Sequence, residues 1–262
     1  MNLLARVRDR LRLSLDLAGQ HRSWRLARNY RLGGGYERVY LYHIRKTGGT
    51  SLNYMFLALG GEASPDVYSR LTHNRMLRAI IGDKVYVGWN KPLIEQGRYF
   101  YAFSHIPAHQ LTLPGRTFTI TCLRDPVTRV LSLYRMLVEY RDNNIPHPMM
   151  VRQGAWLGHG FADFLERIPR RHLLRQLFMF SEAFSPAEAF DRIRACSHYF
   201  FLEDFAAGVR TLSEKLQIAL EPLHVKQAAS DPVIHQADIE RLRSLLEPEY
   251  VLYHRLRQAC AT

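Results

Sequence analysis

Short strand-like and longer helix-like hydrophobic patterns alternate along the first half of the chain. Apolar runs that end in polar or glycine-containing loops predict strands at 38–44, 99–104, 117–123 and 199–202. Apolar residues at helical spacing predict helices at 50–59, 126–140, 161–168, 171–180, 186–195, 205–216 and 237–246. Because strands and helices alternate, we expect an α/β fold with a parallel sheet of about four to five strands flanked by helices.

The first predicted strand leads into a loop suited to binding an anion. The loop sequence is Arg45-Lys-Thr-Gly-Gly-Thr-Ser51, and the helix at 50–59 begins within it. Glycine lets the backbone approach a ligand closely, and a helix N-terminus presents N–H groups with a favourable dipole. Lys46 adds a positive charge, and Thr47, Thr50 and Ser51 add hydroxyl donors.

A second cationic loop follows the strand at 117–123. Arg124 closes that strand, and Pro126 stands where a helix takes its first residue. Ser132 lies seven residues after Asp125, which is close to two helical turns, and therefore on roughly the same face. Arg124 and Ser132 can together hold one phosphate through a planar fork and a hydroxyl. We expect Asp125 to cap the helix and Arg129 to lie on its solvated face.

The two loops, in this order, resemble the sulfotransferases that use 3′-phosphoadenosine 5′-phosphosulfate (PAPS), in particular carbohydrate-type members related to heparan sulfate 2-O-sulfotransferase. In that family a Lys-Thr-(Gly/Ala)-(Gly/Ser)-Thr-Ser loop holds the 5′-phosphosulfate, and an Arg-Asp-Pro-x-x-Arg-x-x-Ser segment holds the 3′-phosphate. The resemblance runs from about Val39 to Leu137 and implies a P-loop-like fold. Many relatives also return a basic or polar loop to the nucleotide late in the chain. The candidate donor-binding residues are accordingly Arg45, Lys46, Thr47, Gly48, Gly49, Thr50, Ser51, Arg124, Ser132 and Lys226.

The resemblance implies transfer of a sulfuryl group from PAPS, which leaves as PAP, to an acceptor hydroxyl or amine. Such a transfer requires alignment, charge stabilisation and a base, with Lys46 neutralising charge as the bond breaks. This logic requires no metal. The segments 62–98, with Tyr68, Tyr86 and Trp89, and 141–160, with Trp156 and His159, are candidate walls for a sugar acceptor, because aromatic rings stack on sugar faces. Arg141 or Arg152 can meet an acidic group of the acceptor.

His105 is the candidate base, because histidine titrates near neutrality and this residue follows the strand at 99–104. Relatives of the 2-O-sulfotransferase type carry Gly-His-Val-x-(Tyr/Phe) at about this place, with the His proposed as base. Here Ser104 replaces the glycine and Ala108 replaces the aromatic residue. Glu95 is a second candidate base, because some sulfotransferases use glutamate.

Three alternatives stay open. The first is a kinase-like P-loop enzyme, although that motif places its lysine after the glycines and Lys46 precedes them. The second is a basic nucleic-acid-binding protein, although the chain lacks a recognition motif. The third is a nucleotide-binding protein without catalysis.

The positive charge of the chain is concentrated at its N-terminus. The 262 residues include 36 Lys and Arg and 24 Asp and Glu, a formal net charge of +12. Residues 1–32 contain eight Arg and two Asp, a net charge of +6, and their leucines and valine recur at helical spacing. We therefore expect a basic amphipathic N-terminal segment at 1–35, with Gly33–Gly35 as a flexible joint, and a catalytic domain at 36–262.

Cysteine usage and hydropathy favour a cytoplasmic enzyme. The three cysteines are scattered without metal-binding spacing, which favours a reducing compartment, and we expect no membrane-spanning segment. The basic N-terminal helix can lie on the inner face of an anionic membrane, near a carbohydrate or glycolipid acceptor. The alternative is a helix docked on the domain with its arginines in solvent.

Overall fold

A six-stranded sheet forms the centre of the computed structural model, which describes residues 19–73, 78–223 and 232–261. The strand order is β2-β3-β4-β1-β5-β6. The strands are β1 Arg38–Tyr42, β2 Arg78–Ile81, β3 Lys84–Gly88, β4 Tyr101–Ser104, β5 Thr117–Leu123 and β6 His198–Phe201. All neighbouring strands are parallel except β2, which pairs antiparallel with β3. The α/β prediction is confirmed, but the sheet has two strands, β2 and β3, that the sequence analysis did not anticipate.

Helices follow most of the predicted ranges. They are α2 Gly49–Ala58, α3 Ser64–His73, α4 Lys91–Gln96, α5 Pro126–Asp142, α6 Pro148–Gln153, α7 Phe161–Arg167, α8 Arg170–Leu173, α9 Arg175–Phe180, α10 Pro186–Arg194, α11 Phe205–Leu216, α12 Gln236–Leu245 and α13 Glu247–Ala261. The predicted helix at 171–180 is in fact two, because Leu174 leaves the helical conformation at ψ 50°. Within the described ranges, no helix is both long enough and apolar enough to cross a membrane.

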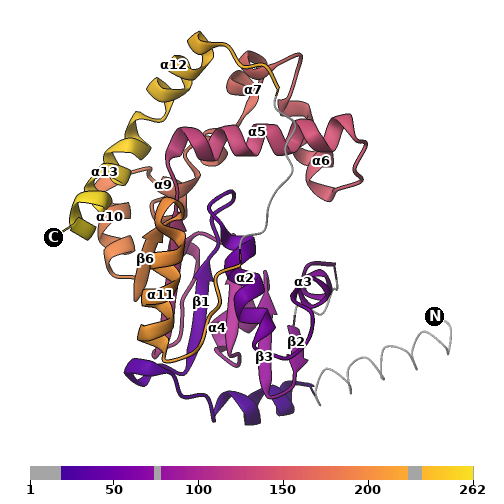
Figure 1. Ribbon diagram of the computed structural model, residues 1–262, viewed down its shortest axis with the longest axis vertical. Helices are drawn as coiled ribbons and strands as arrows, with labels where there is room; N and C mark the ends of the chain where they lie inside the picture. The colour runs from indigo at the N-terminus through magenta and orange to yellow at the C-terminus, as the bar shows by residue number, and fades with distance from the viewer. Residues whose placement is uncertain (1–18, 74–77, 224–231, 262) are drawn as a thin grey trace.

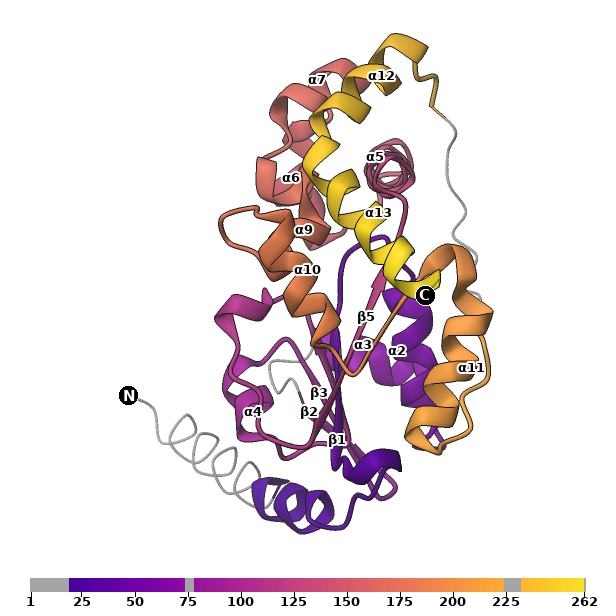
Figure 2. The same ribbon diagram turned by 90° about the vertical axis from the view of Figure 1, so that its left-hand side faces the viewer.

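Helices cover both faces of the sheet. Along β1, Val39 and Leu41 pack into one apolar cluster with residues of α2, α3 and α11, as alternation along a strand requires. Tyr40 and Tyr42 pack into the other cluster, with residues of α4, α5, α9, α10 and α13. Figure 2 shows α2 and α11 on one side of the sheet and α4 on the other.

The central strand β1 lies at the point where the chain changes direction across the sheet. Strands β2 to β4 lie on one side of β1, whereas β5 and β6 lie on the other. In open α/β sheets, ligands bind outside the carboxyl ends of the strands at such a switch point. Helices α5, α6 and α7 stand beyond that edge of the sheet, in the upper part of Figure 1.

The described part of the N-terminal segment is docked on the domain. Residues 19–27 are helical, and Ala27, Tyr30 and Leu32 are buried. The Tyr30 hydroxyl donates to the carbonyl of Asp83 at 2.9 Å and accepts from the N–H of Val85 at 3.0 Å. A Cβ at Gly33 would lie 2.2 Å from a backbone oxygen of α11. Gly33 therefore packs closely against the domain, whereas a Cβ at Gly35 would meet nothing within 4 Å. The flexible joint at Gly33–Gly35 stays a prediction, and residues 1–18 lie outside the described residues.

Candidate active site

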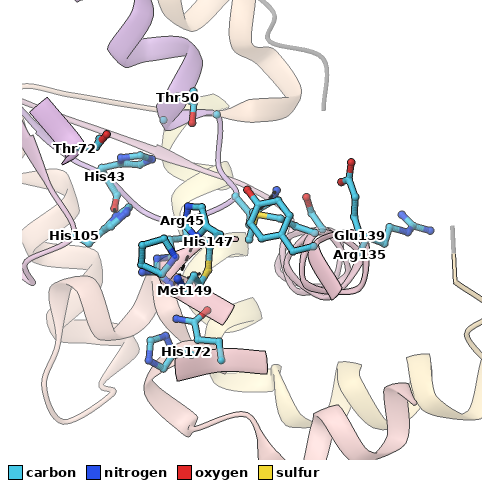
Figure 3. A pocket seen from close by; sticks show the side chains of 18 of the residues that line it. His43, Arg45, Thr50, Thr72, His105, Arg135, Glu139, His147, Met149 and His172 are labelled. Carbon is cyan, nitrogen blue, oxygen red and sulfur yellow. Dashed lines mark hydrogen bonds between the residues drawn. The ribbon is translucent and has the colours of Figure 1, made fainter. Parts of the chain in front are cut away.

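A cavity of about 1730 Å³ opens at the carboxyl edge of the sheet. The loops that follow β1, β4 and β5 line it together with residues of α2, α3, α5, α6 and the 169–172 segment. Figure 3 shows His43 and His105 on one side of the cavity and Arg135 and Glu139 of α5 on the other. The cavity brings together these predicted site residues: Arg45, Lys46, Gly48, Gly49, Thr50, Ser51, His105, Arg124 and Ser132. Two donor-site candidates are not part of this set. The Thr47 hydroxyl is buried and donates to the carbonyl of Ile44 at 3.0 Å, and Lys226 lies outside the described residues.

The loop after β1 needs its two glycines for different reasons. Gly48 is the N-cap of α2 and has φ 83°, in the left-handed region that favours glycine. Gly49 lies against the ring of His43, where an added Cβ would be 2.0 Å from the ring carbon Cδ2. Gly48 offers no side-chain cap, and Gly48, Gly49, Thr50 and Ser51 at the N-terminus of α2 all line the cavity.

The basic side chains of Arg45, Lys46 and Arg124 line the cavity, where burial disfavours their charged forms. Burial, and then the nearby Arg124, lower the pKa of Lys46 to about 8. Burial also lowers the pKa of Arg45 and that of Arg124 below the usual value for arginine. Arg45 Nη1 and Lys46 Nζ donate to the thioethers of Met149 and Met136, at 3.5 and 3.6 Å, and thioethers are weak acceptors. An anion in the cavity would offset this desolvation and charge repulsion.

The segment after β5 has the expected helix cap at Asp125, but Arg129 of α5 does not have the role expected of it. The Asp125 carboxylate accepts from the N–H of Thr128 at 2.8 Å and caps α5, as predicted. The expectation that Arg129 lies on a solvated face is wrong. Its side chain is 1 % exposed and donates through Nε to Glu249 at 3.3 Å and through Nη2 to the carbonyl of Leu173. Its partners lie far along the chain, so local periodicity could not identify them.

The loop after β4 presents His105 to the cavity in one tautomer. Its Nδ1 lies 2.5 Å from the carbonyl oxygen of His43, and a carbonyl oxygen can only accept. The proton is therefore on Nδ1, and Nε2 has the lone pair. Burial, and then His43 and Arg45, hold the pKa of His105 well below its ordinary value, so the expectation that this residue titrates near neutrality is wrong and the ring is neutral in the free protein. Ser104 fixes the turn, because its hydroxyl contacts the Tyr40 hydroxyl at 2.7 Å and accepts from the N–H of Ile106 at 3.0 Å.

Neither Glu95, the second candidate base, nor the nearby His109 lines the cavity. The carboxylate of Glu95 accepts from the N–H of Thr112 at 3.0 Å, and Glu95 is absent from the cavity lining. His109 packs on Phe178, with ring centroids 5.4 Å apart, and is also absent from the lining. Within the described ranges, His, Cys, Asp and Glu side chains form no group of three or more that could hold a metal.

Several cavity residues were not singled out from the sequence. They are His43, Arg135, Glu139, His147, Met149, Arg171 and His172. Their segments, the end of β1 and 135–172, come together only in the fold. Among the expected acceptor walls, Tyr68, Trp89, Arg152 and Trp156 line the cavity. Tyr86 instead donates to the carbonyl of Phe56 in the core, and Arg141 pairs with Asp142 at the surface.

Comparison with known proteins matches residues 35–178 to the family described as the sulfotransferase family. The match covers 144 of the 262 residues and contains both cationic loops, His105 and Ser132. A search of the curated proteins found no match. The chain belongs to the sulfotransferase family, and its activity is the transfer of a sulfuryl group from a sulfate donor to an acceptor.

Proposed function

We propose that this sulfotransferase uses PAPS as donor and transfers the sulfuryl group to a hydroxyl of a carbohydrate or glycolipid, as relatives of the heparan sulfate 2-O-sulfotransferase type do. The observation that carries the proposal is the meeting of Lys46, Arg124 and the N-terminus of α2 at one cavity. The lowered pKa of Lys46 and of Arg124 means that this region favours a bound anion.

The residues present fit a nucleotide that carries phosphate groups at two positions. Lys46, Thr50, Ser51 and the N-terminus of α2 would hold the 5′ end, where the glycines leave room for close backbone approach. Arg124 and Ser132 would hold the 3′-phosphate. When bound, PAPS supplies an activated sulfuryl group. Lys46 would stabilise the negative charge that develops as this group departs.

His105 is proposed as the general base. With its proton fixed on Nδ1, the ring can accept the acceptor hydroxyl's proton at Nε2. The rings of Tyr68, Trp89 and Trp156 line the same cavity and offer apolar faces on which a sugar can stack. Arg152 offers a charge for an acidic group of the acceptor.

A transfer assay tests the acceptor class. The protein is incubated with PAPS and a panel of oligosaccharides, glycolipids, phenols and alkyl amines, and PAP release is measured with and without each acceptor. We expect sugar hydroxyls to accelerate PAP release and His105→Ala to abolish that acceleration. Acceleration by phenols or amines alone would contradict the proposed acceptor class while leaving the donor in place.

The N-terminal segment supports a cytoplasmic location at the inner face of a membrane as a second part of the proposal. Residues 17–36 contain no acidic residue, and Arg22, Arg25, Arg28 and Arg31 are all exposed. Trp24 is 44 % exposed, with the Arg28 guanidinium 4.5 Å from its ring centroid. Arginine together with exposed tryptophan suits the surface of an anionic membrane.

A further inference from the structure

We propose that Arg175 and Gln176, neighbours at the start of α9, are positioning residues that hold the two halves of the active site in register. Gln176 holds the loop that carries Arg124, and Arg175 holds the loop that carries His105. This inference rests on the proposed function, in which Arg124 binds the donor phosphate and His105 is the base.

Gln176 contacts both backbone groups of Arg124. Its Oε1 accepts from the N–H of Arg124 at 2.8 Å, and its Nε2 donates to the carbonyl of Arg124 at 2.9 Å. The side chain is 1 % exposed, so these bonds face little competition from water. One planar amide therefore fixes the backbone of Arg124 on both sides, and with it the direction in which the guanidinium leaves the strand end.

The orientation of that amide is itself fixed. Gln176 Nε2 also donates to the carboxylate of Glu249 on α13, at 2.7 Å. A carboxylate accepts hydrogen bonds, so the nitrogen side of the amide must face Glu249 and the oxygen side must face the N–H of Arg124. The buried guanidinium of Arg129 balances the charge of Glu249, at 3.3 Å.

Arg175 holds the backbone of His105, the proposed base. Its Nη2 donates to the carbonyl of His105 at 2.6 Å, across 70 positions of the chain. The ring of His105 is held separately, through Nδ1 and the carbonyl of His43. Arg175 is 9 % exposed and contributes its hydrogen bond from within the protein rather than from the cavity wall.

Helix α9 is a rigid support for this pair. Leu177, Met179 and Phe180 are fully buried in the apolar cluster that contains Tyr40 and Tyr42, so the short helix is held by its apolar side. Because Arg175 and Gln176 are consecutive, one peptide unit links the base loop to the phosphate loop. A displacement of about 1 Å between reacting groups is enough to cost about 100-fold in rate.

Adjacent variants should then have different kinetic effects. Gln176→Ala should weaken PAP binding in calorimetry by about tenfold, the worth of one to two buried hydrogen bonds, and raise KM for PAPS while sparing kcat at saturating donor. Arg175→Gln should lower kcat by about tenfold or more with PAP affinity preserved, because only the base is displaced. Arg175→Lys, which keeps a donor and the charge, should recover most of kcat.

Controls separate positioning from general loss of packing. Met179→Leu changes the same helix without touching either loop and should leave both parameters unchanged. Amide hydrogen exchange in the free protein should rise in the peptide containing Arg124 for Gln176→Ala, and in the peptide containing Ile106 for Arg175→Gln. Gln176→Asn, one methylene shorter, is the second variant if Gln176→Ala does not fold, and the same loss of PAP affinity is expected of it.

Two results would overturn the inference. One is parallel loss of PAP affinity and kcat in both variants, which indicates loosening of α9. The other is wild-type behaviour in both. PAP binding by the wild-type protein distinguishes failure of the proposed function from failure of this inference. Its absence would reject the proposed donor. Its presence, together with wild-type behaviour of both variants, would reject only the role of Arg175 and Gln176.

Discussion

His105 donates its Nδ1 proton to the carbonyl oxygen of His43, the residue that follows β1. The two rings are also neighbours, with centroids 4.4 Å apart. The loop that holds the base therefore depends on the strand that leads into the anion-binding loop. This bond leaves the lone pair of His105 on Nε2, the form that a general base requires.

Replacement of His105 by alanine should separate catalysis from donor binding. We expect transfer to fall by about 10²- to 10⁴-fold, the usual contribution of a general base, while PAP binds as tightly as to the wild type. His109→Gln, in the same segment but outside the cavity lining, is the matched control. An unchanged rate in His105→Ala would remove this residue from the mechanism.

Donor affinity should fall as pH rises through about 8, the pKa of Lys46 in the free protein. Below that pH the lysine is charged and ready to bind an anion; above it, the protein must take up a proton before binding. We expect PAP to bind about tenfold more weakly one pH unit above this pKa. Calorimetry between pH 7.5 and 9.5, in buffers of different ionisation enthalpy, measures both the affinity and the proton uptake.

Lys46→Arg provides the control for this pH dependence, because arginine stays charged throughout the range. Its PAP affinity should not change with pH. A wild-type affinity that stays flat up to pH 9.5, or an equal decline in Lys46→Arg, would show that another group is responsible.

Removal of one partner of the buried Arg129–Glu249 pair should lower the free energy of unfolding more than replacement of both partners by apolar residues. Their side chains are 1 % and 0 % exposed. Glu249→Ala leaves an uncompensated guanidinium in the core and should cost about 3 to 5 kcal/mol of unfolding free energy. The double variant Arg129→Met with Glu249→Leu should cost less than Glu249→Ala alone, because no charge remains buried. Urea denaturation measures both, and additive losses would contradict the expected coupling.

The basic N-terminal segment should bring the full chain to anionic vesicles. Sedimentation with vesicles rich in anionic lipid should retain the protein, whereas vesicles of neutral lipid should not. Charge reversal at Arg25 and Arg28, both exposed, should abolish the interaction without altering PAP affinity. Equal binding to both kinds of vesicle, or retention by duplex DNA instead, would contradict the membrane proposal.

The sequence predicted best those parts of the site that local patterns determine. Glycine, lysine and hydroxyl residues at the start of a helix identify an anion-binding loop from local sequence alone. The structure brings Lys46, Arg124, Ser132 and His105 to one cavity. The positions of strands β1, β4, β5 and β6 along the chain followed from the same short apolar runs, whereas their order in the sheet did not.

What the sequence analysis missed has two physical causes. Strands β2 and β3 form a hairpin, which the search for alternating strands and helices does not reveal; its sequence signal is Gly82-Asp83 between two apolar runs, and Gly82 has φ 58°. Arg129, Gln176 and Glu249 form a network between segments as much as 120 positions apart, and periodicity carries no information about such partners. In the sequence, a buried charged residue cannot be distinguished from a surface one until its partner is identified.

Calorimetric titration with PAP tests the central claim most directly, with ATP and duplex DNA as parallel ligands and Lys46→Ala and Arg124→Ala as variants. The account predicts PAP binding in the micromolar range that both variants lose, and neither ATP nor DNA should match it. Absence of PAP binding by the wild-type protein, or PAP binding that survives in both variants, would contradict the assignment of this cavity as the donor site.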